Sequence, residues 1–182
     1  MHFLNARTQV HQTNVANTRA AVAPGVRPND WRTSVPRPMV EALRDGRYAA
    51  AEAQYRGDDF DHYTFFRVWR PTSGKKKGCL LIKTQHSEAY KEFITIYPSG
   101  SVWFAQSSPR LDQALLMVCA DPYTTAQNYA RLHERCSCCG KKLTDERSRW
   151  YGIGPECKGR WPEIIRTVNE TKGIGPNGGW FA

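Results

Sequence analysis

The chain reads Cys136-Ser137-Cys138-Cys139-Gly140-Lys141 and, further on, Gly152-Ile153-Gly154-Pro155-Glu156-Cys157, and these two stretches decide the fold of its C-terminal part. Two cysteines separated by two residues and followed by glycine are typical of a zinc knuckle, a tight turn that brings both thiolates to one metal ion. The Gly-Pro pair before Cys157 predicts the start of a helix whose first turn presents a third thiolate. Soft thiolates at this spacing favour Zn²⁺, so we expect Cys136, Cys139 and Cys157 to hold zinc.

The fourth zinc ligand is ambiguous in the sequence, although a closed structural site needs four protein ligands. His133 precedes Cys136 at ligand spacing and can turn back from the end of a helix, so we predict it as the fourth ligand; the alternative is a solvated helix residue. Cys138 adjoins Cys139, and adjacent residues of a knuckle rarely reach the same metal, so it is expected to be a small filler. Cys79 and Cys119 lie in apolar surroundings and are predicted to be buried, unreactive thiols.

The composition predicts a globular, strongly basic protein. The 182 residues include 40% hydrophobic and 12% aromatic residues, with a formal charge of +9 and an isoelectric point near 9.4. Such a charge favours an anionic partner, and nucleic acid is the commonest one for a small basic protein with a zinc finger. The alternative is that the excess charge belongs to solvated tails.

The arrangement of the cysteines and the hydropathy of the chain indicate the cellular location. Cysteines clustered in a knuckle indicate a metal site in a reducing compartment better than a disulfide framework. No apolar run has the length needed to cross a bilayer, so we expect no membrane partner, and the N-terminus lacks the apolar core of a secretory signal. The expected location is the cytoplasm, or the host cytoplasm for a phage protein.

The pattern along the chain predicts an α+β fold, with a small antiparallel β-sheet packed with helices and a C-terminal treble-clef-like zinc finger. Helical patterns cover 36–56, 109–120, 122–135 and 163–169, and strands rich in β-branched and aromatic residues are expected at 63–70, 79–84, 92–97 and 102–104. We divide the chain into a flexible basic N-terminal arm (1–35), an α+β domain (36–130), the zinc finger (131–170) and a glycine-rich tail (171–182). The Trp180-Phe181 pair in that tail either docks on a surface or frays.

Two groups of basic residues are predicted to contact nucleic acid. Lys75, Lys76 and Lys77 form the tip of a hairpin, and Tyr63, Phe65 and Trp69 at alternate positions of the adjoining strand could stack bases. The alternative is that these aromatics belong to the core and the lysine tip is only solvated. The second group surrounds the expected metal and could contact phosphates. It consists of Lys141, Lys142, Arg147, Arg149, Lys158 and Arg160.

An acidic stretch raises one alternative function. Asp58, Asp59, Asp61 and His62 are residue types that hold a hard metal ion in nucleases, but they equally suit a polar loop leading into a strand. No further carboxylates or second histidine stand at a supporting spacing. We therefore predict no enzymatic activity.

The segment from Arg135 to Trp161 resembles a small zinc-finger family of unknown function common in actinomycete and bacteriophage proteins. The resemblance rests on Cys-x-x-Cys-Gly with a basic pair, on Gly152-Ile153-Gly154-Pro155-x-Cys157, and on Leu143-Thr144-Asp145 and Ser148 between them. Weaker upstream matches are Gly46-Arg47-Tyr48-Ala49, Phe66-Arg67-Val68, Asp121-Pro122 and Tyr129-Ala130-Arg131. The resemblance implies a metal-binding accessory protein found near nucleic-acid enzymes, with ligands at positions 136, 139 and 157 and no established catalytic activity.

These observations together predict a non-enzymatic, zinc-binding accessory protein of a phage or bacterium that binds nucleic acid. The alternative is a protein-binding inhibitor or adaptor that seizes a host nucleic-acid or defence enzyme, a role that the Arg-rich arm and the Trp-Phe tail would suit. Salt separates the two, because phosphate binding weakens steeply with ionic strength and an apolar anchor does not.

Overall fold

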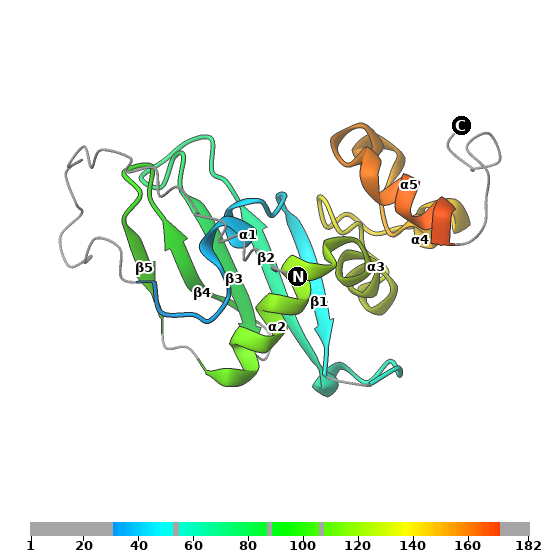
Figure 1. Ribbon diagram of the computed structural model, residues 1–182. Coiled ribbons are helices and arrows are strands. Elements are labelled where there is room, and N and C mark those ends of the chain that lie inside the picture. The colour runs from blue at the N-terminus through cyan, green and yellow to red at the C-terminus, as the bar shows by residue number, and fades with distance from the viewer. Residues whose placement is uncertain (1–30, 53–54, 87–88, 106–107, 172–182) are drawn as a thin grey trace, which may run out of the picture.

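The computed structural model describes residues 31–52, 55–86, 89–105 and 108–171 (Figure 1). Residues 1–30 of the expected basic arm, and the glycine-rich tail from 172 onward with Trp180 and Phe181, lie outside the described residues. The elements, in chain order, are α1 (Arg37–Glu41), β1 (Gly46–Ala51), the 3-10 helix η1 (Phe60–His62), β2 (Tyr63–Trp69), β3 (Leu80–His86), β4 (Ala89–Ile96), β5 (Val102–Phe104), α2 (Pro109–Ala120), α3 (Pro122–His133), α4 (Glu146–Tyr151), the 3-10 helix η2 (Pro155–Arg160) and α5 (Pro162–Thr171).

The five strands form one antiparallel sheet in the order β1-β2-β3-β4-β5. Each strand therefore pairs with its neighbour in sequence, as short hairpin connections allow. The turn between β2 and β3 uses Gly74 and Gly78 at φ 78° and 77°, backbone angles that favour glycine. The sheet and its helices confirm the α+β fold and the four strands expected from β-branched and aromatic residues.

The helix predicted over 36–56 is wrong in its second half. Among the described residues of this range, only α1 is helical, and residues 46–51 form the edge strand β1, in which Ala49 lies opposite Phe65. Pairing with β2 satisfies the backbone of this segment, and its alanines are small enough for α3 to lie against it. Helix propensities differ by less than about 1 kcal/mol per residue, so this tertiary pairing outweighs them.

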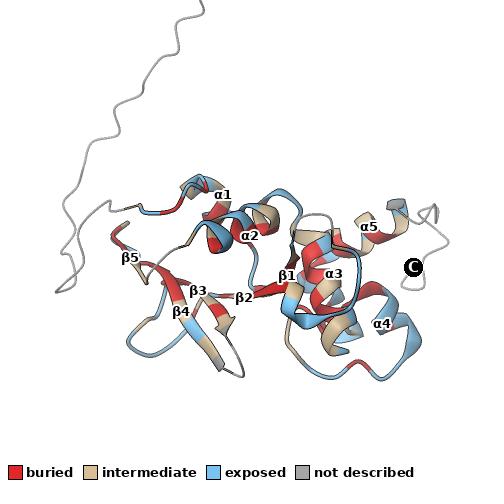
Figure 2. Ribbon diagram, turned by 90° about the horizontal axis from the view of Figure 1, so that it is seen from below, coloured by how far each residue is buried: buried red, intermediate tan, exposed pale blue. Residues whose placement is uncertain are grey.

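One face of the sheet is covered by α1 and α2 (Figure 2). Tyr48, Phe66 and Ile82 point to this face, where they join Leu115 and Val118 of α2 in one buried cluster. The start of α2 is fixed by Ser108, whose hydroxyl oxygen accepts a hydrogen bond from the Leu111 backbone N–H at 3.3 Å. The main core therefore lies between this face and the two helices.

The opposite face of the sheet is covered over only part of its width. Near β1, Phe65 packs with Tyr129 of α3. Farther along, Trp69 and Trp103 occur at the two ends of one cross-strand row and are each 37% exposed. Figure 2 draws α3, α4 and α5 beyond β1, and no described helix lies under β2 to β5. This face leaves two indole rings accessible.

The C-terminal elements pack on the same core as the sheet. The buried cluster that contains the strand residues also includes Cys136, Leu143, Ile153 and Trp161. The expected treble-clef-like finger therefore docks directly against the edge of the sheet, and its assignment to that class stays a prediction. At the other end of the chain, residues 31–35 of the expected arm are packed: the indole N–H of Trp31 donates to the Val35 carbonyl at 2.7 Å, and its ring meets Phe104 edge-on.

Candidate metal centre and the basic hollow beside it

The knuckle is a tight turn closed by backbone hydrogen bonds. The Gly140 N–H donates to the Cys136 carbonyl, and the Cys136 N–H donates to the Lys141 carbonyl, both at 2.8 Å. Gly140 has φ 81°, in the left-handed region that favours glycine. An isolated antiparallel bridge between Arg135 and Lys142 continues the hairpin. The turn thus brings Cys136 and Cys139 together, as the spacing predicted.

A short helix returns the chain to this turn. Asp145 begins α4 by accepting a hydrogen bond from the Ser148 N–H at 2.9 Å, and Gly152 ends the helix at φ 70°. Gly154 and Pro155 then begin η2, in which Cys157 occupies the first turn. The predicted Gly-Pro helix entry is confirmed, although the helix is of the 3-10 type.

Three cysteine thiols meet at the end of this path. The Sγ atoms of Cys136, Cys139 and Cys157 all lie within 4.8 Å of one another, and two of the three residues are buried. The Gly154 N–H donates to the Cys136 sulfur at 3.4 Å, a contact that stabilises a thiolate. Tetrahedral zinc with Zn–S bonds of about 2.3 Å requires S···S separations of about 3.8 Å, so the donor set fits zinc. In the described part of the chain, this is the one group of three or more metal-type side chains.

The electrostatics of the cluster favour a bound cation. Burial raises the pKa of the Cys157 thiol far above its usual value. Burial also opposes ionisation of Cys139, but the Lys141 backbone N–H and the neighbouring thiols bring the pKa of Cys139 below its usual value. Several thiols in contact cannot all ionise without mutual repulsion, and a divalent cation removes that repulsion. The cluster can therefore hold a metal ion.

His133 is not brought to the three cysteines. Its ring packs among the rings of Tyr129, Phe65 and Phe60, with centroids 4.6, 4.9 and 5.0 Å away. Burial, together with the Arg135 charge, lowers the pKa of this histidine, and its Nε2 atom is buried without a hydrogen-bond partner among the described residues. The proposed fourth ligand thus lies in an aromatic box at the end of α3.

Of the three remaining cysteines, Cys138 lies near the cluster, whereas Cys79 and Cys119 pack in the core. The Cys138 thiol is close enough to Cys157 for a side-chain hydrogen bond, nearer the cluster than the sequence suggested. Cys79 is 2% exposed, and Cys119 is half-buried against the core. Burial raises the pKa of both, that of Cys119 to about 11, as expected of unreactive thiols.

The acidic stretch does not gather its carboxylates around a common point. Asp58 pairs with Arg131, and Asp59 caps η1 by accepting from the Asp61 N–H at 3.1 Å. His62 bonds Glu52 at 2.8 Å. These contacts fit the interpretation of a polar loop, because Asp58, Asp59 and His62 each bond to a neighbouring residue.

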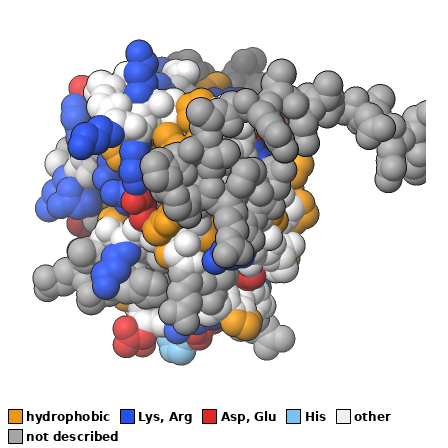
Figure 3. Space-filling view, turned by 90° about the vertical axis from the view of Figure 1, so that its left-hand side faces the viewer, with side chains coloured by type: hydrophobic (Ala, Val, Ile, Leu, Met, Phe, Trp, Pro, Cys, Tyr) orange, Lys and Arg blue, Asp and Glu red, His pale blue; other side chains and the backbone are white. Residues whose placement is uncertain are grey.

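The predicted phosphate contacts are placed at two locations. Lys75 and Lys77 are exposed on the β2–β3 turn, whereas Lys76 leans over the sheet and pairs with Glu92 of β4. The second set surrounds the cysteine cluster, and all six of its members are exposed. Lys141 of this set pairs with Glu156 at 2.8 Å. Figure 3, viewed from the β5 side, shows Lys and Arg side chains gathered along its left-hand margin.

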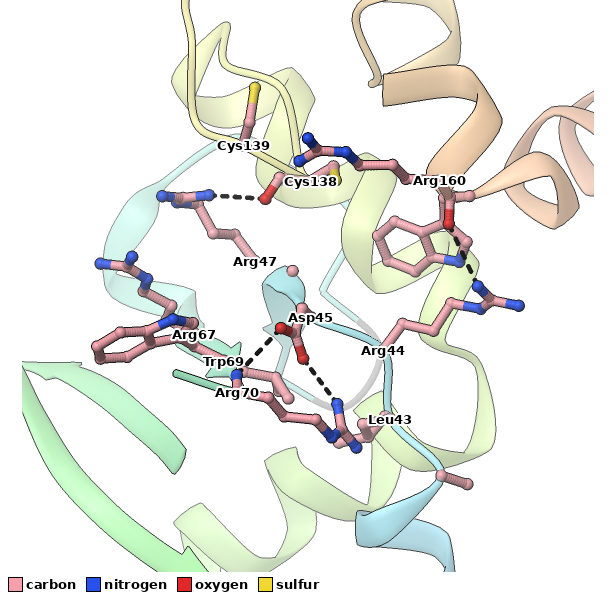
Figure 4. A pocket seen from close by; sticks show the side chains of 14 residues that line it. Leu43, Arg44, Asp45, Arg47, Arg67, Trp69, Arg70, Cys138, Cys139 and Arg160 are labelled. Carbon is pink, nitrogen blue, oxygen red and sulfur yellow. Dashed lines mark hydrogen bonds and ion pairs between the residues drawn. The ribbon is translucent and has the colours of Figure 1, made fainter. Parts of the chain in front are cut away.

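A basic hollow, missed by the sequence reasoning, adjoins the knuckle (Figure 4). It measures about 670 Å³ and lies where the ends of β1 and β2 meet the turn at Cys138 and Cys139. Its charged lining comprises five arginines and a single carboxylate, that of Asp45. The arginines are Arg44, Arg47, Arg67, Arg70 and Arg160. Of these five, only Arg160 is among the residues predicted from the sequence to contact nucleic acid, because the others come from separate segments that the sequence does not show to be neighbours.

Comparison with known proteins gives one match. Residues 126–162 match the model of a family of unknown function (DUF6011). The matched range contains the end of α3, the knuckle and η2, and it covers the segment whose resemblance was noted from its motifs. No curated protein and no solved structure matches the chain. The family description names no metal, activity or partner.

The described helices contain none with the length and apolar character needed to cross a membrane.

Proposed function

We propose that this protein is a non-enzymatic accessory protein that binds one zinc ion through Cys136, Cys139 and Cys157 and binds nucleic acid through the basic surface around that metal. The resemblance of the segment to a finger of phage and actinomycete proteins supports a phage or bacterial role. Free thiols in the cluster support a reducing compartment such as the cytoplasm.

The observation that carries this proposal is the charge around the cysteine cluster. Residues 135–160 contain seven basic and three acidic residues. Two of the acidic groups are already engaged, Asp145 in capping α4 and Glu156 in pairing with Lys141. The exposed basic side chains therefore present a positive surface, which attracts the phosphate backbone.

Zinc has a structural role in this proposal. The segment from Arg135 to Cys157 contains one six-residue α-helix, one isolated bridge and the first turn of η2, too little regular structure to fold alone. Bound to three thiolates, the ion would join the knuckle to η2 and hold the basic side chains in one arrangement. His133, the fourth ligand predicted from the sequence, packs among aromatic rings, and the Cys138 thiol lies close to Cys157, so Cys138 is the better candidate for the fourth position.

The test is binding to labelled DNA and RNA, single- and double-stranded, across a salt series, with protein of known zinc content. We expect sub-micromolar binding at low salt and a steep decline of affinity as salt increases. Replacing Lys142 and Arg149 by Gln should reduce the slope of that decline by about two. Absence of binding to every probe at low salt would contradict the proposal and favour the protein-binding alternative.

A further inference from the structure

We propose that the arginine hollow binds single-stranded nucleic acid, with backbone phosphates between Arg47, Arg67 and Arg160 and a base stacked on the Arg67–Trp69 pair. This inference rests on the proposed nucleic-acid binding. It moves the centre of the interface from the outer surface of the knuckle to the hollow, and it specifies the form of the nucleic acid.

The net positive charge of the hollow favours a bound anion. Asp45, its one carboxylate, is held by Arg70 at 2.7 Å, and Arg44 is neutralised by Glu163 at 2.6 Å. Among the described residues, the other three guanidinium groups form no ion pair, and the lining of the hollow holds no further acid. Three arginines line about 670 Å³, and although Arg160 is close enough to Glu156 to lower the pKa of that carboxyl, the three repel one another unless an anion lies between them. Phosphate matches their forked donors.

The arginines are held in place by the structure around them. Arg47 and Arg67 are directly opposite each other on β1 and β2, so they share one face of the sheet. The Arg47 guanidinium donates to the Cys138 carbonyl at 3.0 Å and lies against Gly140. Figure 4 shows Arg160 reaching from η2 toward Cys138, on the side of the hollow where Arg47 lies. The Arg47 guanidinium is therefore oriented before any ligand arrives, which lowers the entropic cost of binding.

The aromatic part of the hollow favours unpaired bases. The Arg67 guanidinium lies 5.4 Å and the Lys83 ammonium 5.8 Å from the centre of the Trp69 ring, which is 37% exposed. Indole and guanidinium planes stack on nucleobases without regard to sequence. A duplex keeps its bases stacked on one another and offers only its backbone, whereas a single strand can place a base here.

A second exposed indole extends this surface. Trp103 stands in the same cross-strand row as Trp69, three strand spacings away, which is about 14 Å. Both rings belong to the face that Figure 2 shows without a described helix. A strand leaving the hollow along this face would meet a further stacking position. Leu81 and Thr95, which lie between the two indoles in this row, are buried, so the hollow is continued by the exposed Trp103 ring and not by open sheet.

The experiment compares binding of labelled oligothymidylate and oligouridylate of about 12 nucleotides with binding of a duplex of the same length, for wild type and variants. The variants are Trp69→Ala and the pair Arg67→Gln/Arg160→Gln. The matched controls are Trp150→Ala, a tryptophan 46% exposed on α4, and the pair Lys91→Gln/Arg166→Gln, which removes the same charge away from the hollow. Zinc content and circular dichroism confirm that each variant is folded.

We expect wild type to bind the single strands at least about tenfold more tightly than the duplex. Trp69→Ala should weaken single-strand binding about tenfold with an unchanged salt slope, and the arginine pair should lower the slope by about two. The controls should change affinity less than about threefold. This inference is overturned if wild type prefers the duplex. It is also overturned if the hollow variants and the control variants weaken binding equally. Either result leaves the proposed function standing. No binding by wild type would reject both.

Discussion

The contact between Gly140 and Arg47 links the candidate metal centre to the sheet. Gly140 has φ 81°, and a Cβ atom at this position would lie 2.7 Å from the central carbon of the Arg47 guanidinium. The backbone of Arg47 also contacts the knuckle, since its N–H donates to the Ser137 carbonyl at 2.7 Å. One arginine of β1 therefore positions the turn that carries two of the three cysteines.

Gly140→Ala should be more destabilising than Gly74→Ala. Both glycines have positive φ, and left-handed backbone at alanine costs about 1–2 kcal/mol. Nothing lies within 4 Å of a Cβ atom at Gly74, so only this strain applies there. At Gly140 the Cβ atom would also displace the Arg47 guanidinium from its hydrogen bond to the Cys138 carbonyl, which should add about 0.5–1.5 kcal/mol. Urea denaturation of both variants measures the difference, and equal losses would show that Arg47 is free to move.

The environment of His133 leads to a separate prediction. We expect His133→Ala to retain wild-type zinc content and to lose about 1–3 kcal/mol of stability, because its ring fills a space between three aromatic rings. Metal analysis and urea denaturation of the variant test the two parts. His62→Ala serves as the control, since His62 lies in η1, where it stacks on Tyr55 and bonds Glu52 and is no part of the cysteine cluster. Loss of zinc from the His133 variant alone would restore histidine as the fourth ligand.

The elements show where sequence patterns are informative and where they are not. Strands β2 to β5 and helices α2 and α3 follow from local signals, namely β-branched runs and Ser-Pro or Asp-Pro helix starts. The Ala-rich segment of β1 has a helical signal, and only its pairing with β2 makes it a strand. Helix α4 was missed, although Asp145 and Gly152 are standard start and stop residues.

Trp161, at the junction of η2 and α5, docks the C-terminal elements on β1. Its ring is 2% exposed, meets Tyr48 edge-on at 5.7 Å and lies against Gly46. Trp161→Ala should cost about 3–5 kcal/mol, as for other buried large side chains. Trp150→Ala, on the exposed side of α4, should cost less than about 1 kcal/mol. Thermal or urea denaturation compares them, and similar losses would contradict this docking.

At the scale of the molecule, the cysteine cluster and the sheet share one core. Buried residues of both belong to one continuous cluster, which runs from Val102 through Tyr48 to Cys136 and Val168. Groups that share a core lose their packing together, so unfolding of one part weakens the other. The position of the hollow follows from the same arrangement, because its walls come from both parts.

Unfolding of the zinc-loaded protein should therefore be a single transition. Removing zinc with a chelator should lower its midpoint by about 10 °C or more, because the metal then no longer holds the knuckle. Scanning calorimetry before and after chelation measures both effects, and adding zinc back should restore the midpoint. Two separate transitions in the zinc-loaded protein would show that the finger folds independently of the sheet.

The sequence could predict the cysteine cluster of the candidate metal centre but not the hollow. The spacing of the three cysteines within a short segment predicts that they cluster, and the structure confirms that their sulfur atoms meet. The fourth ligand could not be settled, because the course of α3 decides where His133 points. The hollow depends on arginines from positions as distant as Arg47 and Arg160, which only the docking of the knuckle on β1 brings together.

The most direct test of the central claim is the zinc content of the purified chain, measured by native mass spectrometry. We predict one zinc ion per wild-type chain, none in Cys139→Ser, and one in the control Cys119→Ser, whose thiol packs against the core away from the cluster. A wild-type chain that takes up no zinc, or a Cys139→Ser chain that keeps a zinc ion and melts as wild type does, would contradict the account.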